Sequence, residues 1–159
     1  MTLWSGRFSS GPGDTLWRFT TDTSDRRLLV DDVTGSLAHV GMLGGVGLLP
    51  ADRVERIEEG LEHILEEAHA GRFEFQATDE DVHTAVERRL GELIGPEAGH
   101  LHTGRSRNDQ IALDLRLYLR RAVDHRVEQI QHLVAVLVDR AERAGDAVVA
   151  SYTHLQQAQ

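Results

Sequence analysis

The sequence predicts an all-α fold, in which a mixed helical domain precedes the first long helix of a helical bundle. Apolar residues recur at intervals of three and four over residues 50–71 and 79–93, which is the spacing of one helix face. An amphipathic pattern then runs without proline or glycine over residues 107–144. No stretch alternates with period two for long enough to predict a sheet. We therefore expect an N-terminal helical domain with an extended arm over residues 1–106, and the truncated start of a bundle over residues 107–159.

The first fifty residues divide into a polar arm and an apolar, glycine-dense segment. Residues 1–27 are rich in Gly, Ser, Thr and Asp and show no sustained period, which predicts an extended arm with turns. Residues 28–49 are densely apolar but contain glycine at positions 41, 44, 45 and 47. This density indicates either close helix packing near a functional turn or a poorly specified helix with a glycine-rich end.

Two shorter helices follow, each with a clear stop. The first opens at Pro50 and ends at Gly71, and the second covers residues 79–93 and stops at Gly95 and Pro96. Proline is favoured at a helix start and glycine just past a helix end. The apolar stripes comprise Val54, Ile57, Leu61 and Ile64 in the first helix, and Val82, Val86, Leu90 and Leu93 in the second.

The helix predicted over residues 107–144 is too long for a chain of this size. About 38 residues at a rise of 1.5 Å per residue give roughly 57 Å. A globule of 159 residues is only roughly 30 Å across. The apolar stripe of such a helix cannot be covered by the rest of the chain. It must pack on partner helices, either in a longer polypeptide or in other subunits.

Composition excludes several classes of function. A net charge of −9 argues against a nucleic-acid partner. The chain has no cysteine, which excludes disulfides, thiolate metal sites and a cysteine nucleophile. All 17 cationic residues are arginine, so this segment has no lysine for Schiff-base chemistry. No apolar run reaches membrane-spanning length, and residues 1–20 lack a secretory signal. We expect a cytoplasmic protein with no membrane partner.

Residues 101–110 (LHTGRSRNDQ) carry the strongest chemical signal. Arg105 and Arg107 lie beside Gly104 at the start of the long helix, where the helix dipole disfavours cations. Their placement favours an anionic ligand, since guanidinium groups and backbone N–H groups bind carboxylate and phosphate. The alternative is that both arginines are plain helix-start charges. Asn108 either orients a carboxylate or caps the helix.

The remaining candidates are weaker. His154 follows Thr153 in a polar stretch after the long helix. A lone histidine is more often a surface or core residue than a catalyst, although its ordinary pKa suits proton transfer near neutrality. The nine histidines form no HExxH pattern or comparable ligand spacing. We therefore expect no metal.

Five segments of the chain, in order, resemble the signatures of argininosuccinate lyases. Residues 101–110 are similar to the first signature of that family, and residues 151–159 (SYTHLQQAQ) to the second. Shorter matches are residues 3–8 (LWSGRF), 32–39 (DVTGSLAH) and 80–83 (EDVH). The resemblance implies a cytoplasmic homotetramer, built around a central bundle of long helices, with active sites shared between subunits and no cofactor or metal.

The resemblance also implies a reaction and roles for individual residues. Members of the family split argininosuccinate into arginine and fumarate by β-elimination, in arginine biosynthesis or the urea cycle. Arg107 and Asn108 match residues that hold substrate carboxylates, and Ser36 matches a substrate-binding serine. Thr153 and His154 match the pair placed at the scissile bond. His154 is then the acid/base or the group that orients it, with Thr153 also contacting substrate.

The sequence departs from the family pattern in ways that keep other readings open. Family members are longer, and a third signature carries the serine taken as the base and a substrate lysine. We therefore expect residues 1–159 to fold poorly and to be inactive alone. Ser151 and Gln157 replace Gly and Arg, and the arm lacks an expected asparagine. The alternatives are a non-catalytic helical assembly fragment, an anion-binding protein, and another fumarate-releasing lyase of the superfamily.

Overall fold

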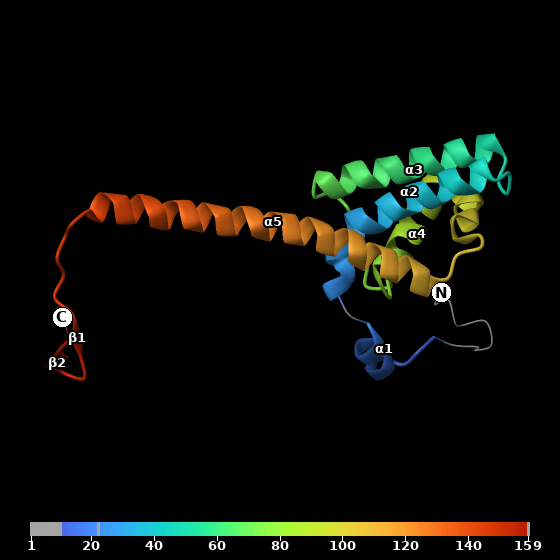
Figure 1. Cartoon of the computed structure of the whole chain (residues 1–159). Helices are drawn as coiled ribbons and strands as arrows, with labels where there is room; N and C mark the ends of the chain where they lie inside the picture. Colours follow the sequence, from blue (N-terminus) through green and yellow to red (C-terminus); the bar gives the residue numbers. More distant parts are fainter. Residues whose placement is uncertain (1–10, 22, 159) are drawn as a thin grey trace. The chain divides into compact units, whose positions relative to one another are not determined.

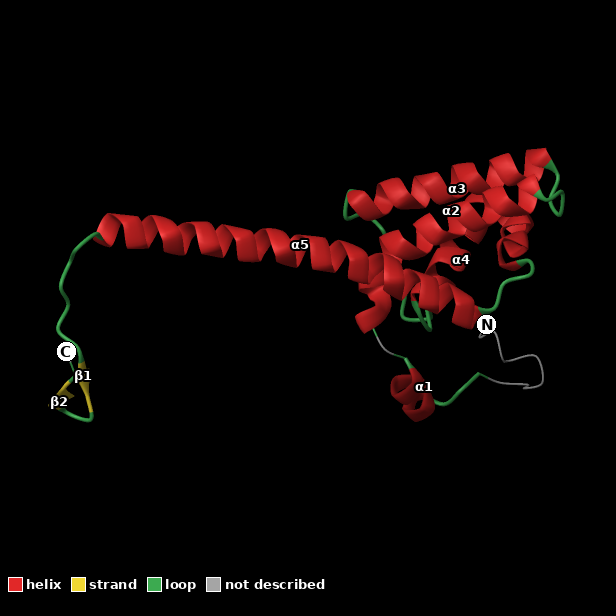
Figure 2. Ribbon diagram, viewed as in Figure 1, coloured by secondary structure: helices red, strands yellow, loops and turns green. Residues whose placement is uncertain are grey.

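The computed structural model describes residues 11–21 and 23–158 and confirms the all-α prediction. In this part of the chain the only strands are two of two residues each; Figure 2 shows how completely helix dominates. The opening LWSGRF segment lies outside the described residues. The elements in chain order are α1 (Asp14–Thr20), η2 (Ser24–Leu28), α2 (Leu29–Gly45), α3 (Ala51–His69), α4 (Val82–Ile94), η3 (Gly95–His102), α5 (Arg107–Ala144), β1 (Tyr152–Thr153) and β2 (Gln156–Gln157).

The chain divides into two compact units, residues 1–119 and 120–159. The division falls within α5, a single helix of 38 residues whose bounds agree with those predicted from the apolar stripe. The predicted domain boundary after residue 106 stays a prediction. None of the helices in the described residues has the length and apolar character needed to cross a membrane.

The core of the first unit lies between α2, α3 and α4. Each of these helices contacts the other two, and α2 and α3 run side by side in Figure 1. The predicted stripes face inward, since Ile57, Leu61 and Leu90 are completely buried. Burial of each such side chain stabilises the fold by roughly 1.5–3 kcal/mol.

The glycine-dense segment forms a regular helix, and its glycines allow close packing. A Cβ on Gly44 would lie 2.8 Å from Cγ2 of Val54, so any larger residue there would require Val54 of α3 to shift. The chain then turns at Gly47, whose φ of 74° is costly for residues with a Cβ. Of the two interpretations that the sequence left open, close packing is the one observed at Gly44.

Capping places the start of α4 three residues later than predicted. The carboxylate of Asp81 accepts hydrogen bonds from the backbone N–H and the hydroxyl of Thr84, each at 2.6 Å. An Asp in this role satisfies an orphan donor of the first turn. The helix therefore begins at Val82 and not at residue 79. It ends at Gly95, where φ is 73°.

The prediction of an extended arm was wrong for residues 14–20 and 24–28. The first of these segments is α1, in which the hydroxyls of Thr20 and Thr21 donate to the Trp17 carbonyl. The second is the 3-10 helix η2. Two turns of helix are too short to display an apolar period, and α1 buries none of its residues. Hydrophobic periodicity therefore cannot reveal such a short helix in the sequence.

The second unit consists of the rest of α5 and a short hairpin. Every described residue from 120 to 158 is exposed except Ala122, which is half-buried. The hairpin pairs Tyr152 with Gln157 and Thr153 with Gln156. His154 and Leu155 form its turn with φ of 51° and 60°, as in the two-residue turns that connect antiparallel strands.

Candidate active site

The two predicted anion-binding arginines lie next to each other in the fold: Arg105 in the short loop between η3 and α5, and Arg107 as the first residue of α5. The carbonyl of Thr103 lies 3.0 Å from Nε2 of His39 in α2. Gly104 follows with a φ of 65°, a conformation that favours glycine. The hydroxyl of Ser106 then accepts a hydrogen bond from the backbone N–H of Asn108 at 3.2 Å. Ser106 thus caps α5, and Asn108, which is exposed, does not.

Arg105 is held by one hydrogen bond and leaves two of its nitrogens without a partner among the described residues. Its Nη1 donates to the hydroxyl of Ser36 at 3.2 Å. Its Nε and Nη2 are buried and have no hydrogen-bond partner in that part of the chain. Burial lowers the pKa of Arg105 below its ordinary value, although the carboxylates of Asp32 and Glu87 oppose the shift. A buried guanidinium with free donors is poised to bind an anion.

Arg107 lies against two acceptors and also keeps a free donor. Its Nη1 is 3.0 Å from a carboxylate oxygen of Glu87 and donates to Oε1 of Gln110 at 2.9 Å. Its Nη2 is buried and lacks a hydrogen-bond partner among the described residues. The loop and the first residue of α5 therefore present two guanidinium groups with buried donors left over, a type of group that binds carboxylate.

Beneath the loop lies a buried polar cluster of Asp32 in α2, His83 in α4, and Gln110 and Asp114 in α5. All four residues are at most 3% exposed. Nδ1 of His83 donates to Oδ1 of Asp32 at 3.0 Å and lies 3.5 Å from Oδ2 of Asp114. Gln110 donates its amide to the same Oδ1 of Asp32. We refer to Asp32, His83 and Asp114 together as the buried triad.

The buried triad raises the pKa of two of its members. Burial lowers the pKa of His83, but the hydrogen bond and charge of Asp32, with the charge of Asp81, raise it above its ordinary value overall. Burial and the neighbouring charge of Asp32 raise the pKa of Asp114 to about 7. Both groups therefore hold a proton more tightly in the folded protein than in a free chain.

Sequence reasoning did not find this triad because its members come from three helices. Asp32 and His83 belong to segments that match the family, but no local spacing links them. The only local signal is the i, i+4 pair of Gln110 and Asp114, which places both on one face of α5.

The triad offers three ligand atoms within 4.8 Å of one another, a set that could hold a metal ion. The expectation of no metal stays a prediction.

The structure places the other predicted site residues as follows. Ser36 is completely buried, with its hydroxyl bonded to Arg105. Thr153 and His154 belong to the hairpin of the second unit, where Oγ1 of Thr153 lies 3.0 Å from Nδ1 of His154. The first unit thus brings Ser36 to Arg105, two residues before Arg107, and the second unit pairs Thr153 with His154. The catalytic and substrate-binding roles of these residues stay predictions.

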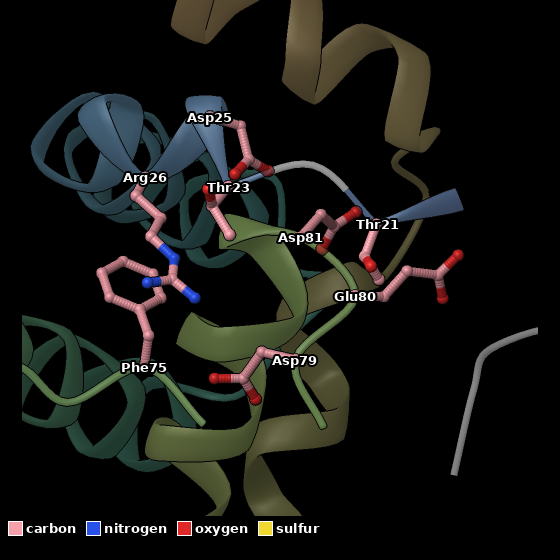
Figure 3. A pocket seen from close by; sticks show the side chains of 8 residues that line it. All are labelled: Thr21, Thr23, Asp25, Arg26, Phe75, Asp79, Glu80 and Asp81. Carbon is pink, nitrogen blue, oxygen red and sulfur yellow. The ribbon is translucent and has the colours of Figure 1, made fainter. Parts of the chain in front are cut away.

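A separate small cavity lies where η2 meets the start of α4. Its volume is about 20 Å³, and its lining includes the carboxylates of Asp25, Asp79 and Asp81. Figure 3 shows Arg26 above the ring of Phe75 at one side of this space, with 4.7 Å between guanidinium and ring centre. A space of this size holds about one water molecule. This cavity is therefore no candidate for a substrate site.

Comparison with known proteins agrees with the motifs. Residues 6–159 match the model of a family described as lyase. Over 158 residues the chain is 46% identical to the argininosuccinate lyase of Geobacillus sp. (strain WCH70), and equally to those of Heliobacterium mobile and Streptococcus pneumoniae (strain Hungary19A-6). Each match covers 99% of this chain and 34% of the relative. The chain thus spans about a third of the length of these relatives. The predicted resemblance is confirmed, and the chain belongs to the lyase family.

Proposed function

We propose that this chain forms part of a carbon–nitrogen lyase that converts argininosuccinate into arginine and fumarate in arginine biosynthesis. The observation that carries the proposal is the pair of arginines in the loop after η3 and at the first residue of α5. There Arg105 and Arg107 keep buried guanidinium donors without a partner among the described residues. The substrate and fumarate both carry carboxylates, which such donors bind. The names and the 46% identity of the relatives support the choice of substrate.

The proposed reaction needs charge stabilisation at a carboxylate. A base removes a proton from the carbon beside that carboxylate, and the electron pair passes into an aci-carboxylate. The C–N bond then breaks, fumarate forms, and an acid protonates the departing guanidinium nitrogen. Arg107 and Asn108 would hold the carboxylate as its negative charge grows, which is where fixed donors accelerate a reaction most.

Roles for the other predicted residues follow from their surroundings. His154 would supply or orient the acid, with Thr153 at 3.0 Å from its ring as a substrate and orienting contact. Substrate contact by Ser36 stays a prediction, and its bond to Arg105 supports a second role in holding that guanidinium. No cofactor, metal, nucleic acid or membrane is part of the proposal.

We further propose a homotetramer in the cytoplasm with active sites shared between subunits, and the exposed stripe of α5 supports assembly with other helices. Val123, Ile130 and Leu137 on this helix are each more than half exposed. Apolar stripes of this kind are covered when helices assemble into a bundle. In such an assembly the Thr153–His154 hairpin of one subunit could serve a site that holds Arg107 of another.

The proposal is tested on the polypeptide encoded by the complete reading frame. Argininosuccinate is added, and fumarate is followed by the ultraviolet absorbance of its conjugated double bond. We expect fumarate from the wild type, and a loss of at least about 100-fold in kcat/KM for Arg107→Ala, because a charge-assisted contact is removed. Arg72→Ala, at an exposed arginine after α3, is the matched control. Absence of fumarate release by the wild type would refute the function.

Two other functions make different predictions. A non-catalytic assembly fragment, which the exposed stripe of α5 favours, would self-associate without any thermal stabilisation by argininosuccinate. A simple anion-binding protein would lose affinity for dicarboxylates in Arg107→Ala and keep it in His154→Ala. Residues 1–159 produced alone should give no turnover, since the serine and lysine of the third signature are missing from them.

A further inference from the structure

An unbroken series of hydrogen bonds connects the buried triad to Arg107. Nη1 of Arg107 donates to Oε1 of Gln110 at 2.9 Å. Nε2 of Gln110 donates to Oδ1 of Asp32, and Nδ1 of His83 donates to that same oxygen at 3.0 Å. Three hydrogen bonds thus join four residues from three helices. The side chains of Asp32 and His83, farthest from Arg107 in the series, are completely or almost completely buried.

At position 110 an amide side chain can make both hydrogen bonds of the series, which other side chains cannot. Its carbonyl oxygen must accept from a guanidinium while its NH2 group donates to a carboxylate. An ionised carboxylate at this position would have no donor for Asp32 and would repel it, and an apolar side chain would offer no hydrogen bond to either neighbour. Gln110 is only 3% exposed, so bulk water has little access to it.

Charged groups of both signs surround the triad. Asp32 and Asp114 face His83 from α2 and α5, and the charges of Arg105 and Arg107 act on them from the loop and the start of α5. Further charged groups nearby are Glu87 in α4, Asp81 at the N-cap of that helix, and His102 in η3. The cluster therefore contains carboxylates next to cationic side chains, and its hydrogen bonds lead through Gln110 to Arg107. These bonds favour a positioning role.

We propose that Gln110 is a positioning residue, anchored by the buried triad, that fixes the guanidinium of Arg107 for its anionic substrate. The proposal rests on the proposed function for the identity of that substrate. Gln110 itself touches no reacting atom. Its contribution is to hold one nitrogen of Arg107, so that the Nη2 left without a partner among the described residues has a fixed direction before substrate arrives. Such preorganisation lowers the cost of binding.

Gln110→Glu gives the sharpest test because its effect depends on protonation. When ionised, the carboxylate introduced by this substitution would turn from Asp32 to Arg107 and neutralise the guanidinium. When protonated, the same side chain could again accept from Arg107 and donate to Asp32, as the amide does. We therefore expect the variant to bind substrate weakly above neutral pH and to recover its affinity on acidification. A merely structural defect would instead give a ratio of variant to wild-type affinity that does not change with pH.

The experiment measures KM and kcat for argininosuccinate, and fumarate affinity by calorimetry, in the polypeptide of the complete reading frame. Gln110→Ala should raise KM and weaken fumarate binding by about tenfold, the effect of one lost charge-assisted hydrogen bond. The change in kcat should be smaller. Gln76→Ala, at an exposed glutamine outside the site, is the control. Circular dichroism verifies that each variant folds.

The outcomes separate this inference from the proposed function. Wild-type turnover with unchanged KM and fumarate affinity in Gln110→Ala, or a pH-independent defect in Gln110→Glu, would overturn the positioning role alone. Fumarate binding that weakens in Gln110→Ala, without wild-type turnover, would support the positioning role and refute the lyase reaction. A wild type that neither binds nor releases fumarate would overturn both.

Discussion

The two units of this chain contain helices of similar amphipathic pattern but differ completely in burial. In the first unit the stripes of α3 and α4 are covered, with Leu61 and Leu90 at zero exposure. In the second unit the stripe of α5 is open, with Leu133 56% exposed. A period of three and four residues therefore predicts a helix and its apolar face, but not what covers that face.

The largest effect should come from truncating one leucine in each unit. Leu61→Ala should destabilise the first unit by about 2–5 kcal/mol in the polypeptide of the complete reading frame, since it leaves a cavity in a packed core. Leu133→Ala should cost less than about 0.5 kcal/mol, as for other exposed positions. Urea unfolding followed by circular dichroism gives both values. A large, concentration-dependent loss in Leu133→Ala would instead show that this stripe is already covered by a second chain.

Two glycine substitutions should distinguish a close-packed position from an open one within the first unit. A Cβ at Gly60 would lie 2.6 Å from Cδ1 of buried Leu90 and 3.1 Å from Cγ2 of Ile94, whereas a Cβ at Gly91 would meet no described atom within 4 Å. Gly60→Ala should therefore destabilise by about 1–3 kcal/mol through overpacking. Gly91→Ala should be neutral or stabilise by up to about 1 kcal/mol, because alanine favours helix. Opposite signs in thermal unfolding would confirm the close approach of α3 and α4; equal signs would contradict it.

The buried triad should make the first unit less stable as pH rises. Asp114 binds its proton more tightly in the folded state, where its pKa is raised to about 7. Its stabilising contribution is therefore full below about pH 4 and is lost as pH rises through about 7. The raised pKa of His83 acts in the same direction from about pH 6.5 upward.

Asp114→Asn isolates this effect. At pH 8 the variant should be more stable than the wild type by about 1–3 kcal/mol, because it removes a buried carboxylate that lacks a hydrogen-bond partner among the described residues. The difference should shrink as the pH falls toward 5. Asp124→Asn, at an exposed position on the same helix, should change little at any pH. Equal stability curves for Asp114→Asn and wild type would contradict the raised pKa.

Most of the fold could be predicted from the sequence, and the exceptions have physical causes. The stripes of α3, α4 and α5 repeat over three or more turns, so their helices could be recognised. Helix α1 has two turns and no buried side chain, which leaves no pattern to read. The start of α4 depends on the cap at Asp81, which the apolar stripe does not report.

The candidate site was only partly predictable for a related reason. Arg105, Arg107 and Asn108 lie within four residues of one another in the sequence, and their clustering was visible there. The contacts of Arg105 with Ser36 and of His83 with Asp32 span 69 and 51 residues. Such pairs exist only once the helices have packed, and nothing in the local sequence encodes them.

The smallest effect should come from ion pairs, and it again distinguishes the two units. Glu67 binds Arg89 through both carboxylate oxygens, at 2.5 and 3.0 Å, with its side chain only 13% exposed. The hydrogen bond with Arg89 lowers the pKa of Glu67, so the pair stabilises at neutral pH and is lost as pH falls below the ordinary carboxyl pKa. Asp139 and Arg143 form one contact of 3.0 Å with side chains 51% and 72% exposed.

Removing the carboxylate of each pair should therefore lower the free energy of unfolding by unequal amounts. Glu67→Ala should cost about 1 kcal/mol because the pair is bidentate and partly shielded from solvent, whereas Asp139→Ala should cost at most about 0.5 kcal/mol, the value of an exposed helix pair. Thermal unfolding at low and high salt provides the measurement. Screening should abolish the effect of Asp139→Ala first, since water already surrounds that pair. If both variants lost the same stability and responded equally to salt, the tail of α5 would have to be as well shielded as the core, and the contrast between the two units would fail.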